Sequence, residues 1–241
     1  MKSYRGPDGS HRLWFEPSEI EEMMEDELRK AGLLPGIEDP SVNLERFIEG
    51  YLRAHLDQYA KLDLGVLGVT EFRPPLAPKV SINCDLTGSA LDEDETPPGI
   101  LGRWRATLAH EAAHIILHRV LFEVPPEENL FGDPTLAAQA QRLFRCLKRD
   151  VGFGANPGDW CEIQANRGMA ALLMPKPIFF DVARRQIRSL GISQSSLVAG
   201  SSPLLPLIRE LSEQFKVSKQ AATIRLESTG LVSPRAQARL T

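Results

Sequence analysis

The strongest constraint on the fold of this 241-residue chain is the run His110-Glu111-Ala112-Ala113-His114, inside a predicted helix over residues 100–120. Apolar residues at helical spacing, Trp104, Leu108 and Ile115, predict that this helix packs in the core. Positions four apart differ by roughly 40° around a helix, so both imidazoles project from one side. Buried imidazoles are costly without partners. The pattern therefore favours a shared metal ion over an accidental pair of histidines.

The spacing of these side chains also predicts what each does. Two neutral imidazoles leave a zinc ion acidic enough for bound water to ionise near neutral pH. Glu111 is rotated by roughly 100° from His110, so it can reach that water without being a ligand. We therefore predict one zinc per chain, with His110 and His114 as ligands and Glu111 as the general base. His118 lies one turn further, where the accumulated rotation favours support of the site, by packing or by contact with a ligand.

The third protein ligand that a catalytic zinc requires is predicted to be Glu162. A predicted helix over residues 160–174 places Glu162 on the same inward face as Asn166 and Met169, and a buried carboxylate needs a partner. The alternative is a capping box, in which Asp159 and Glu162 close the solvent-facing first turn of this helix. Asn166 either orients a metal-bound histidine through its amide or is a polar residue at the edge of the core.

The rest of the pattern predicts an α+β fold, mostly helical, in which a zincin-like domain carries a small antiparallel sheet. Further helices are expected at residues 16–30, 42–59 and 136–148, and strands at residues 66–72 and 79–83. The sheet edge at residues 80–83 is expected to accept substrate as an added strand. We expect an N-terminal helical segment at residues 1–60, a catalytic domain at 61–190, and a helix-turn-helix-like pair packed on it at 203–241.

The C-terminal pair has two interpretations. A helix-turn-helix would place Lys219, Gln220 and Arg225 in a DNA groove, with Ser218 capping the second helix. Acidic residues dilute this face, and the net charge of the whole chain is −4. The composition therefore favours a pair that packs beside the catalytic domain over one that binds DNA.

Composition restricts the compartment. No basic-then-apolar leader and no apolar run of membrane-spanning length occurs in the sequence. The three cysteines are odd in number and widely spaced, which argues against a disulfide framework. We expect a cytoplasmic protein without a membrane partner, and the sequence does not predict its oligomeric state.

Several segments resemble the ImmA/IrrE family of zinc metallopeptidases, from about residue 42 to residue 232. They are residues 105–114 with Leu117 and His118, residues 162–166, residues 170–175, residues 215–218, and Arg225 with Leu226. The resemblance implies a cytoplasmic endopeptidase that cuts a transcriptional repressor, typically one encoded beside it. It also implies that His110, His114 and Glu162 are the zinc ligands and that Glu111 is the general acid and base.

Two functions therefore compete. The first is a zinc-dependent endopeptidase acting on a helix-turn-helix repressor. The second is a non-catalytic regulator that binds a repressor or DNA and in which zinc has only a structural role. Glu111 favours the first, because a purely structural site has no use for a base at this position.

Overall fold

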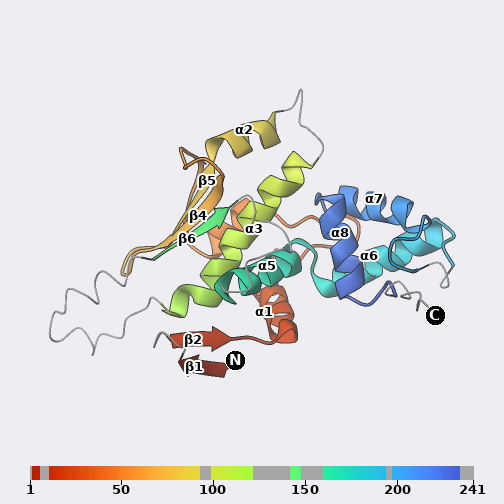
Figure 1. Cartoon of the computed structure of the whole chain (residues 1–241), viewed down its shortest axis with the longest axis horizontal. Coiled ribbons are helices and arrows are strands. Elements are labelled where there is room, and N and C mark those ends of the chain that lie inside the picture. The colour runs from red at the N-terminus through yellow and green to blue at the C-terminus, as the bar shows by residue number, and fades with distance from the viewer. Residues whose placement is uncertain are drawn as a thin grey trace, which may run out of the picture.

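The structure is a computed structural model that describes residues 2–5, 11–92, 99–121, 142–147, 160–193 and 197–233. Its described helices are α1 (Pro17–Lys30), α2 (Cys84–Leu91), α3 (Ile100–His118), α5 (Trp160–Leu173), α6 (Lys176–Ser189), α7 (Leu204–Gln214) and α8 (Lys219–Ser228). Shorter helical segments are the π-helical η1 (Arg46–Tyr51) and the 3-10 turn η2 (Arg119–Leu121). The strands are β1 (Lys2–Arg5), β2 (His11–Trp14), β3 (His55–Ala60), β4 (Val66–Phe72), β5 (Lys79–Asn83) and β6 (Arg142–Leu147). The predicted α+β class is confirmed (Figure 1).

The main sheet has four described strands in the order β3-β5-β4-β6. β4 is antiparallel to both β5 and β6, as predicted for residues 66–72 and 79–83, whereas β3 runs parallel to β5. The sheet is therefore mixed, and the prediction of a wholly antiparallel sheet is wrong. The prediction that β5 is an edge strand is also wrong, because β5 has a paired strand on each side.

The error arises from the helix expected over residues 42–59. Its helical part ends at Tyr51, and Arg53 adopts a positive φ of 56°, which turns the chain out of the helix. β3 follows at once, with Leu56 buried between more exposed neighbours. A second error concerns the helix expected over residues 136–148. Residues 142–147 form β6, and the remainder of that segment lies outside the described residues.

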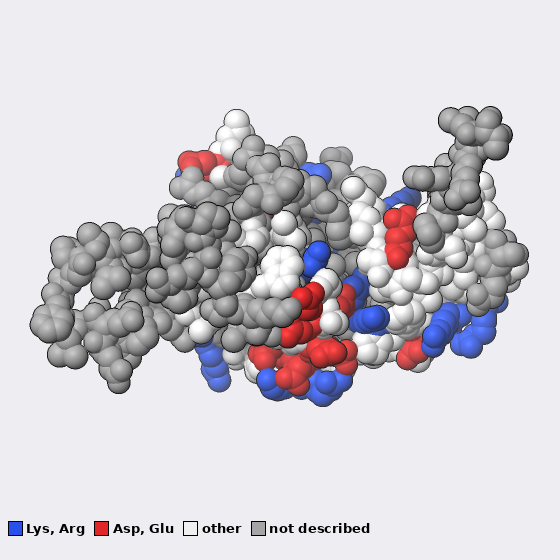
Figure 2. All heavy atoms as spheres, turned by 60° about the horizontal axis from the view of Figure 1, so that its bottom comes forward, with Lys and Arg blue, Asp and Glu red and all other residues white. Residues whose placement is uncertain are grey.

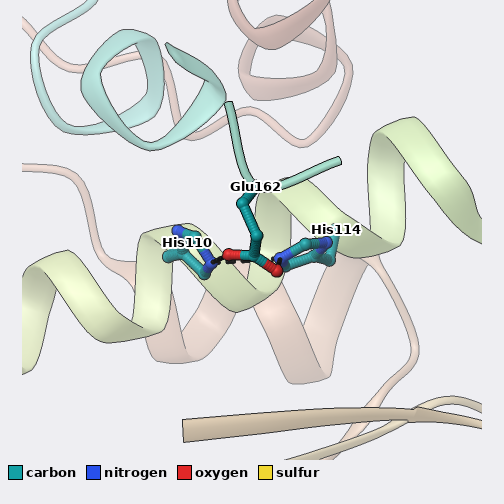
Figure 3. Close-up of side chains that lie close together, drawn as sticks. All are labelled: His110, His114 and Glu162. Atoms are coloured by element: carbon teal, nitrogen blue, oxygen red, sulfur yellow. Dashed lines mark hydrogen bonds and ion pairs between the residues drawn. The ribbon is translucent and has the colours of Figure 1, made fainter. Parts of the chain in front are cut away.

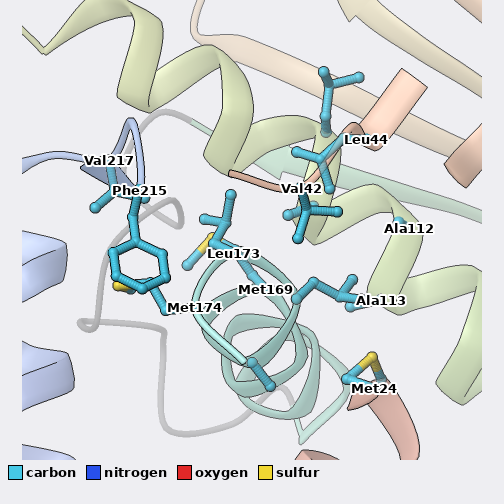
Figure 4. Close-up of a cluster of buried hydrophobic side chains, with 14 of the residues drawn as sticks. Met24, Val42, Leu44, Ala112, Ala113, Met169, Leu173, Met174, Phe215 and Val217 are labelled. Atoms are coloured by element: carbon cyan, nitrogen blue, oxygen red, sulfur yellow. The ribbon is translucent and has the colours of Figure 1, made fainter. Parts of the chain in front are cut away.

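The core lies between the sheet, α3 and α5. α3 and α5 make the most extensive helix pair, and α1 packs on α5 through Ile20, Met24 and Leu28, all completely buried. Gly168 on α5 allows α5 and α3 to approach closely, since a Cβ atom at residue 168 would lie 2.8 Å from the Cβ of Ala113. Figure 4 shows Met24 and Ala113 beside α5, with Phe215 and Val217 entering the same apolar cluster.

The C-terminal pair α7–α8 packs against the rest of the chain, as expected. The buried guanidinium of Arg225 binds both carboxylate oxygens of Glu21 on α1 and donates from Nε to the carbonyl of Met174, 3.1 Å away. Gly102 on α3 is equally close to α8, because a Cβ atom at this position would lie 2.7 Å from the amide nitrogen of Ser218. The expected domain boundaries remain a prediction.

Figure 2 shows acidic side chains gathered on one face of the molecule, over α1. Several of them are paired within the helix, Arg29 with Glu25 and Lys30 with Asp26 and Glu27. This is a solvated helix face, whose opposite side packs in the core. Within the described residues, no helix has the length and apolar character needed to cross a bilayer.

Candidate metal centre

Three side chains that are far apart in the sequence converge between α3 and α5: His110, His114 and Glu162 (Figure 3). One candidate ligand atom from each lies within 4.8 Å of the other two. The Nε2 atoms of the two histidines are 3.0 Å apart, and the carboxylate of Glu162 lies 3.0 Å from Nε2 of His110 and 3.3 Å from Nε2 of His114. Both imidazoles are completely buried, and Glu162 is 9% exposed.

The side chain of Glu162 does not face solvent, as it would if it capped the helix. α5 begins at Trp160, so Glu162 is in its first turn, yet its carboxylate points inward to the two histidines. Asp159, the other half of the expected capping box, lies outside the described residues.

Glu111 faces the sheet rather than α5. Thr70 on β4 donates a hydrogen bond from Oγ1 to Oε2 of Glu111, with an O–O distance of 2.6 Å. Oε1 is buried and has no hydrogen-bond partner among the described residues. Gly68 makes room for this oxygen, because a Cβ atom at residue 68 would lie 2.6 Å from it. One carboxylate oxygen is thus held by the protein, while the other is left without a partner.

Asn166 contacts His110 directly, as the sequence suggested. Its Oδ1 lies 3.2 Å from Nδ1 of His110, and an amide oxygen only accepts, so Nδ1 donates. A neutral imidazole carries one proton, so Nε2 of His110 presents its lone pair to His114 and Glu162.

His118 supports the other histidine and is not one of the three clustered groups. Its Nδ1 lies 3.0 Å from Nδ1 of His114, and its Nε2 lies 3.3 Å from Oε1 of Gln164. Its ring also meets Trp160 edge-on, with centroids 5.6 Å apart. Of the other two histidines, His55 is exposed at the start of β3, and the backbone of His11 is part of β2.

Burial and neighbouring charges shift the pKa values of these groups. Burial raises the pKa of Glu111 to about 7, against the opposing effect of His110. Burial also raises the pKa of Glu162, but the neighbouring imidazoles of His110 and His114 outweigh it and hold that pKa well below its usual range. Burial, aided by His114, lowers the pKa of His118 to about 3, so its imidazole is neutral at physiological pH.

These residues fit a divalent metal. Two imidazole nitrogens and a carboxylate are a ligand set that zinc takes in catalytic sites. Lone pairs and a carboxylate that face one another in a buried space are stabilised by a cation. Among the described residues, this cluster contains no fourth His, Cys, Asp or Glu.

The structure brings His110, His114 and Glu162 together, with Asn166 against His110, His118 against His114, and Glu111 against β4; the contacts of Thr70 and Gln164 with this group were not predicted. Thr70 contacts Glu111 across 41 residues, and nothing in a strand pattern marks such a partner. Gln164 is two positions from Glu162, a rotation of roughly 200°, so helical periodicity places it on the opposite face. α5 is buried nearly all round, which is why both faces carry functional contacts.

The C-terminal pair presents only part of the surface expected for a DNA reader. Lys219 and Gln220 are exposed at the start of α8, whereas Arg225 is 3% exposed and paired with Glu21. One of the three side chains named for a DNA groove is therefore used inside the protein.

A buried helix that carries two histidines and a glutamate, packed between a small mixed sheet and a helix that brings a carboxylate, defines a metallopeptidase. The sequence model of the IrrE N-terminal-like domain, peptidase family M78, matches residues 101–227, more than half of the chain. The protein belongs to this family. No curated protein is similar enough to the chain to count as a relative.

Proposed function

We propose that this metallopeptidase is a zinc-dependent endopeptidase in which His110, His114 and Glu162 hold the metal and Glu111 is the general base. The observation that carries the proposal is the buried Oε1 of Glu111, which has no partner among the described residues and is next in sequence to His110. An unsatisfied buried carboxylate oxygen is costly, and such groups concentrate at functional sites. A water molecule positioned for attack is the partner it lacks.

Zinc, when bound, supplies a Lewis acid that polarises the scissile carbonyl and makes water more acidic. Glu111 accepts a proton from the attacking water as the oxygen of that water bonds to the carbonyl carbon. The same carboxylate then gives the proton to the leaving amine as the C–N bond breaks. Thr70 holds Oε2 throughout, so that Oε1 is the atom that exchanges the proton.

A pocket beside the site supports a peptide substrate. A cavity of about 210 Å³ lies between α3, α5 and α8. Its lining on α3 runs from Ile100 to Ala106, one helical turn before His110, and its other walls include the apolar side chains of Met169 and Leu173. We assign this cavity to an apolar side chain of the substrate next to the cleaved bond.

The proposed substrate is a helix-turn-helix transcriptional repressor in the cytoplasm. Its support is the resemblance to ImmA/IrrE peptidases, whose members typically cut a repressor encoded beside them. The complete burial of His110 and His114 favours the second candidate, a regulator with a structural zinc. A structural zinc has four protein ligands, whereas a catalytic one keeps an open position.

The test compares three proteins: wild type, Glu111→Gln, and the matched control Glu71→Gln. Glu71 lies on β4 and pairs with Arg73, so the control makes the same chemical change outside the site. Each is incubated with the repressor encoded by the adjacent gene, or with a repressor pool, and fragments are identified by mass spectrometry. Wild type and control should cut one defined bond, chelator should stop them, and zinc should restore them.

Glu111→Gln should retain zinc and bind the repressor but cut it about a hundredfold to ten-thousandfold more slowly. If this variant cuts as fast as wild type, the activity belongs elsewhere. If wild type binds a repressor and never cuts it, the regulator with a structural zinc is the better account.

A further inference from the structure

The hydrogen bonds beyond His114 form a continuous chain that ends on the N-terminal strand. In order, it joins His114 to His118, His118 to Gln164, and Gln164 to the backbone carbonyl of Leu13. We infer that this chain of hydrogen bonds fixes the tautomer of His114, so that Gln164 and the N-terminal segment determine metal affinity without supplying a ligand. The inference rests on the proposed role of His114 as a metal ligand.

The backbone carbonyl of Leu13 determines which group donates in each of these hydrogen bonds. This carbonyl can only accept, and the Gln164 amide nitrogen lies 3.0 Å from it, so Nε2 of Gln164 donates there. The amide oxygen of Gln164 must then face His118, and this oxygen also only accepts. Gln164 is 1% exposed and Leu13 is 8% exposed, so neither group exchanges its partner freely with solvent.

His118 passes this direction on to His114. Nε2 of His118, 3.3 Å from the Gln164 oxygen, must carry the proton, and a neutral imidazole then leaves Nδ1 as an acceptor. Nδ1 of His114 lies 3.0 Å from that acceptor and therefore donates its proton. Nε2 of His114 is left with its lone pair, facing Nε2 of His110 and the carboxylate of Glu162. This is the only neutral tautomer of His114 that can coordinate a metal through Nε2.

The two metal histidines are thus oriented in different ways. His110 is held directly by Asn166 on α5. His114 is held through two further side chains and a carbonyl that is 151 positions away from Gln164 in sequence. Because β2 carries that carbonyl, the N-terminal segment belongs to the metal site although it is far from the matched family region at residues 101–227.

The experiment measures zinc affinity with a competing chromophoric chelator, and the imidazole ¹⁵N spectrum of the protein prepared without metal. His118→Leu removes the acceptor for His114, and Gln164→Leu removes the acceptor for His118. Each should weaken zinc binding by about ten- to a hundredfold, as is typical for residues that orient metal ligands. His118→Gln restores an acceptor and should bind zinc more tightly than His118→Leu.

A stability control separates positioning from general damage. Leu211→Ala deletes a completely buried side chain on α7, away from the chain of hydrogen bonds, and should lower the melting temperature without changing zinc affinity. In wild type, the ¹⁵N spectrum should place the proton of His114 on Nδ1 and that of His118 on Nε2.

Two results would overturn the inference: Leu variants of His118 and Gln164 that bind zinc as tightly as wild type, or a spectrum that places the His114 proton on Nε2. If wild type binds no zinc at all, the proposed function fails. The spectrum then still decides whether the tautomer is fixed as described.

Discussion

Gly68 on β4 packs directly against α3, and Gly68→Ala tests how closely. The new Cβ atom would lie 2.6 Å from Oε1 of Glu111 and 2.7 Å from Cγ2 of Thr107. Both separations are shorter than ordinary van der Waals contact, so at least one side chain or β4 must move. Added methyl groups in a packed core cost about 1 to 3 kcal/mol.

Part of this cost is offset in the unfolded state. Alanine loses less backbone entropy than glycine when a strand forms, which contributes roughly 0.5 to 1 kcal/mol of stability. The difference is roughly 0 to 2.5 kcal/mol, and the contacts at 2.6 and 2.7 Å place the expected net loss in the free energy of unfolding in the upper part of this range. For a chain of this size, that lowers the melting temperature by a few degrees, on the order of 2 to 4 °C for each kcal/mol.

The assay is urea unfolding followed by far-ultraviolet circular dichroism, with two companion variants. Gly88→Ala is the matched control: Gly88 lies in α2 with nothing within 4 Å of an added Cβ, so alanine should be neutral or stabilising. Thr107→Ser removes the clashing methyl and keeps the hydroxyl, which donates to the carbonyl of Arg103. Gly68→Ala should cost less in that background.

The reasoning is refuted if Gly68→Ala unfolds at the same urea concentration as wild type, or at a higher one. It is also refuted if Thr107→Ser leaves the cost unchanged and Glu111 has not moved. Zinc content should stay at one per chain in every variant, because none of the substitutions removes a proposed ligand.

Three further outcomes are expected. Arg225→Ala should lower the free energy of unfolding by about 2 to 3 kcal/mol in a urea titration, because it removes buried charge-assisted hydrogen bonds. The control Arg209→Ala breaks an exposed ion pair and should change the free energy of unfolding by less than about 0.5 kcal/mol. Glu162→Gln should reduce zinc affinity by orders of magnitude, measured by chelator competition, while Asp159→Ala should cost only about 1 kcal/mol; zinc retained in both would favour the capping interpretation. Removal of zinc by chelator should lower the melting temperature, and zinc at a hundredfold excess over its dissociation constant should restore about 2.7 kcal/mol of stability; an unchanged melting curve would argue against a bound metal.

Regular periodicity made much of this molecule predictable. α3, α5, β4 and β5 follow from apolar spacing, and the positions of His110, Glu111 and His114 follow from helix geometry alone. Prediction from the sequence was wrong where pairing with a distant strand decides the local conformation. The apolar spacing of residues 44–52 is helical, and nothing local indicates that the next residues pair with β5. α2 and α6 were also missed.

The residues that cluster between α3 and α5 could be predicted from the sequence, whereas the side chains that contact this cluster could be predicted only in part. Glu162 and Asn166 lie on the face that periodicity marks as buried, so both were found. Thr70 and Gln164 act through partners that are 41 and 46 positions away. Such contacts depend on how β4 and α5 approach α3, which a single sequence does not specify.

The position of β6 affects how a peptide can approach Glu111. β4 carries Thr70 and Gly68, which touch the Glu111 carboxylate, and both of its edges are already paired, one with β5 and the other with β6. A peptide that pairs with β4 must therefore displace β5 or β6, and a strand of the same chain competes as an intramolecular partner. Weakly binding peptides lose that competition. Pairing of β4 with β5 and β6 therefore sets a minimum affinity that a peptide needs in order to bind along β4 beside Glu111.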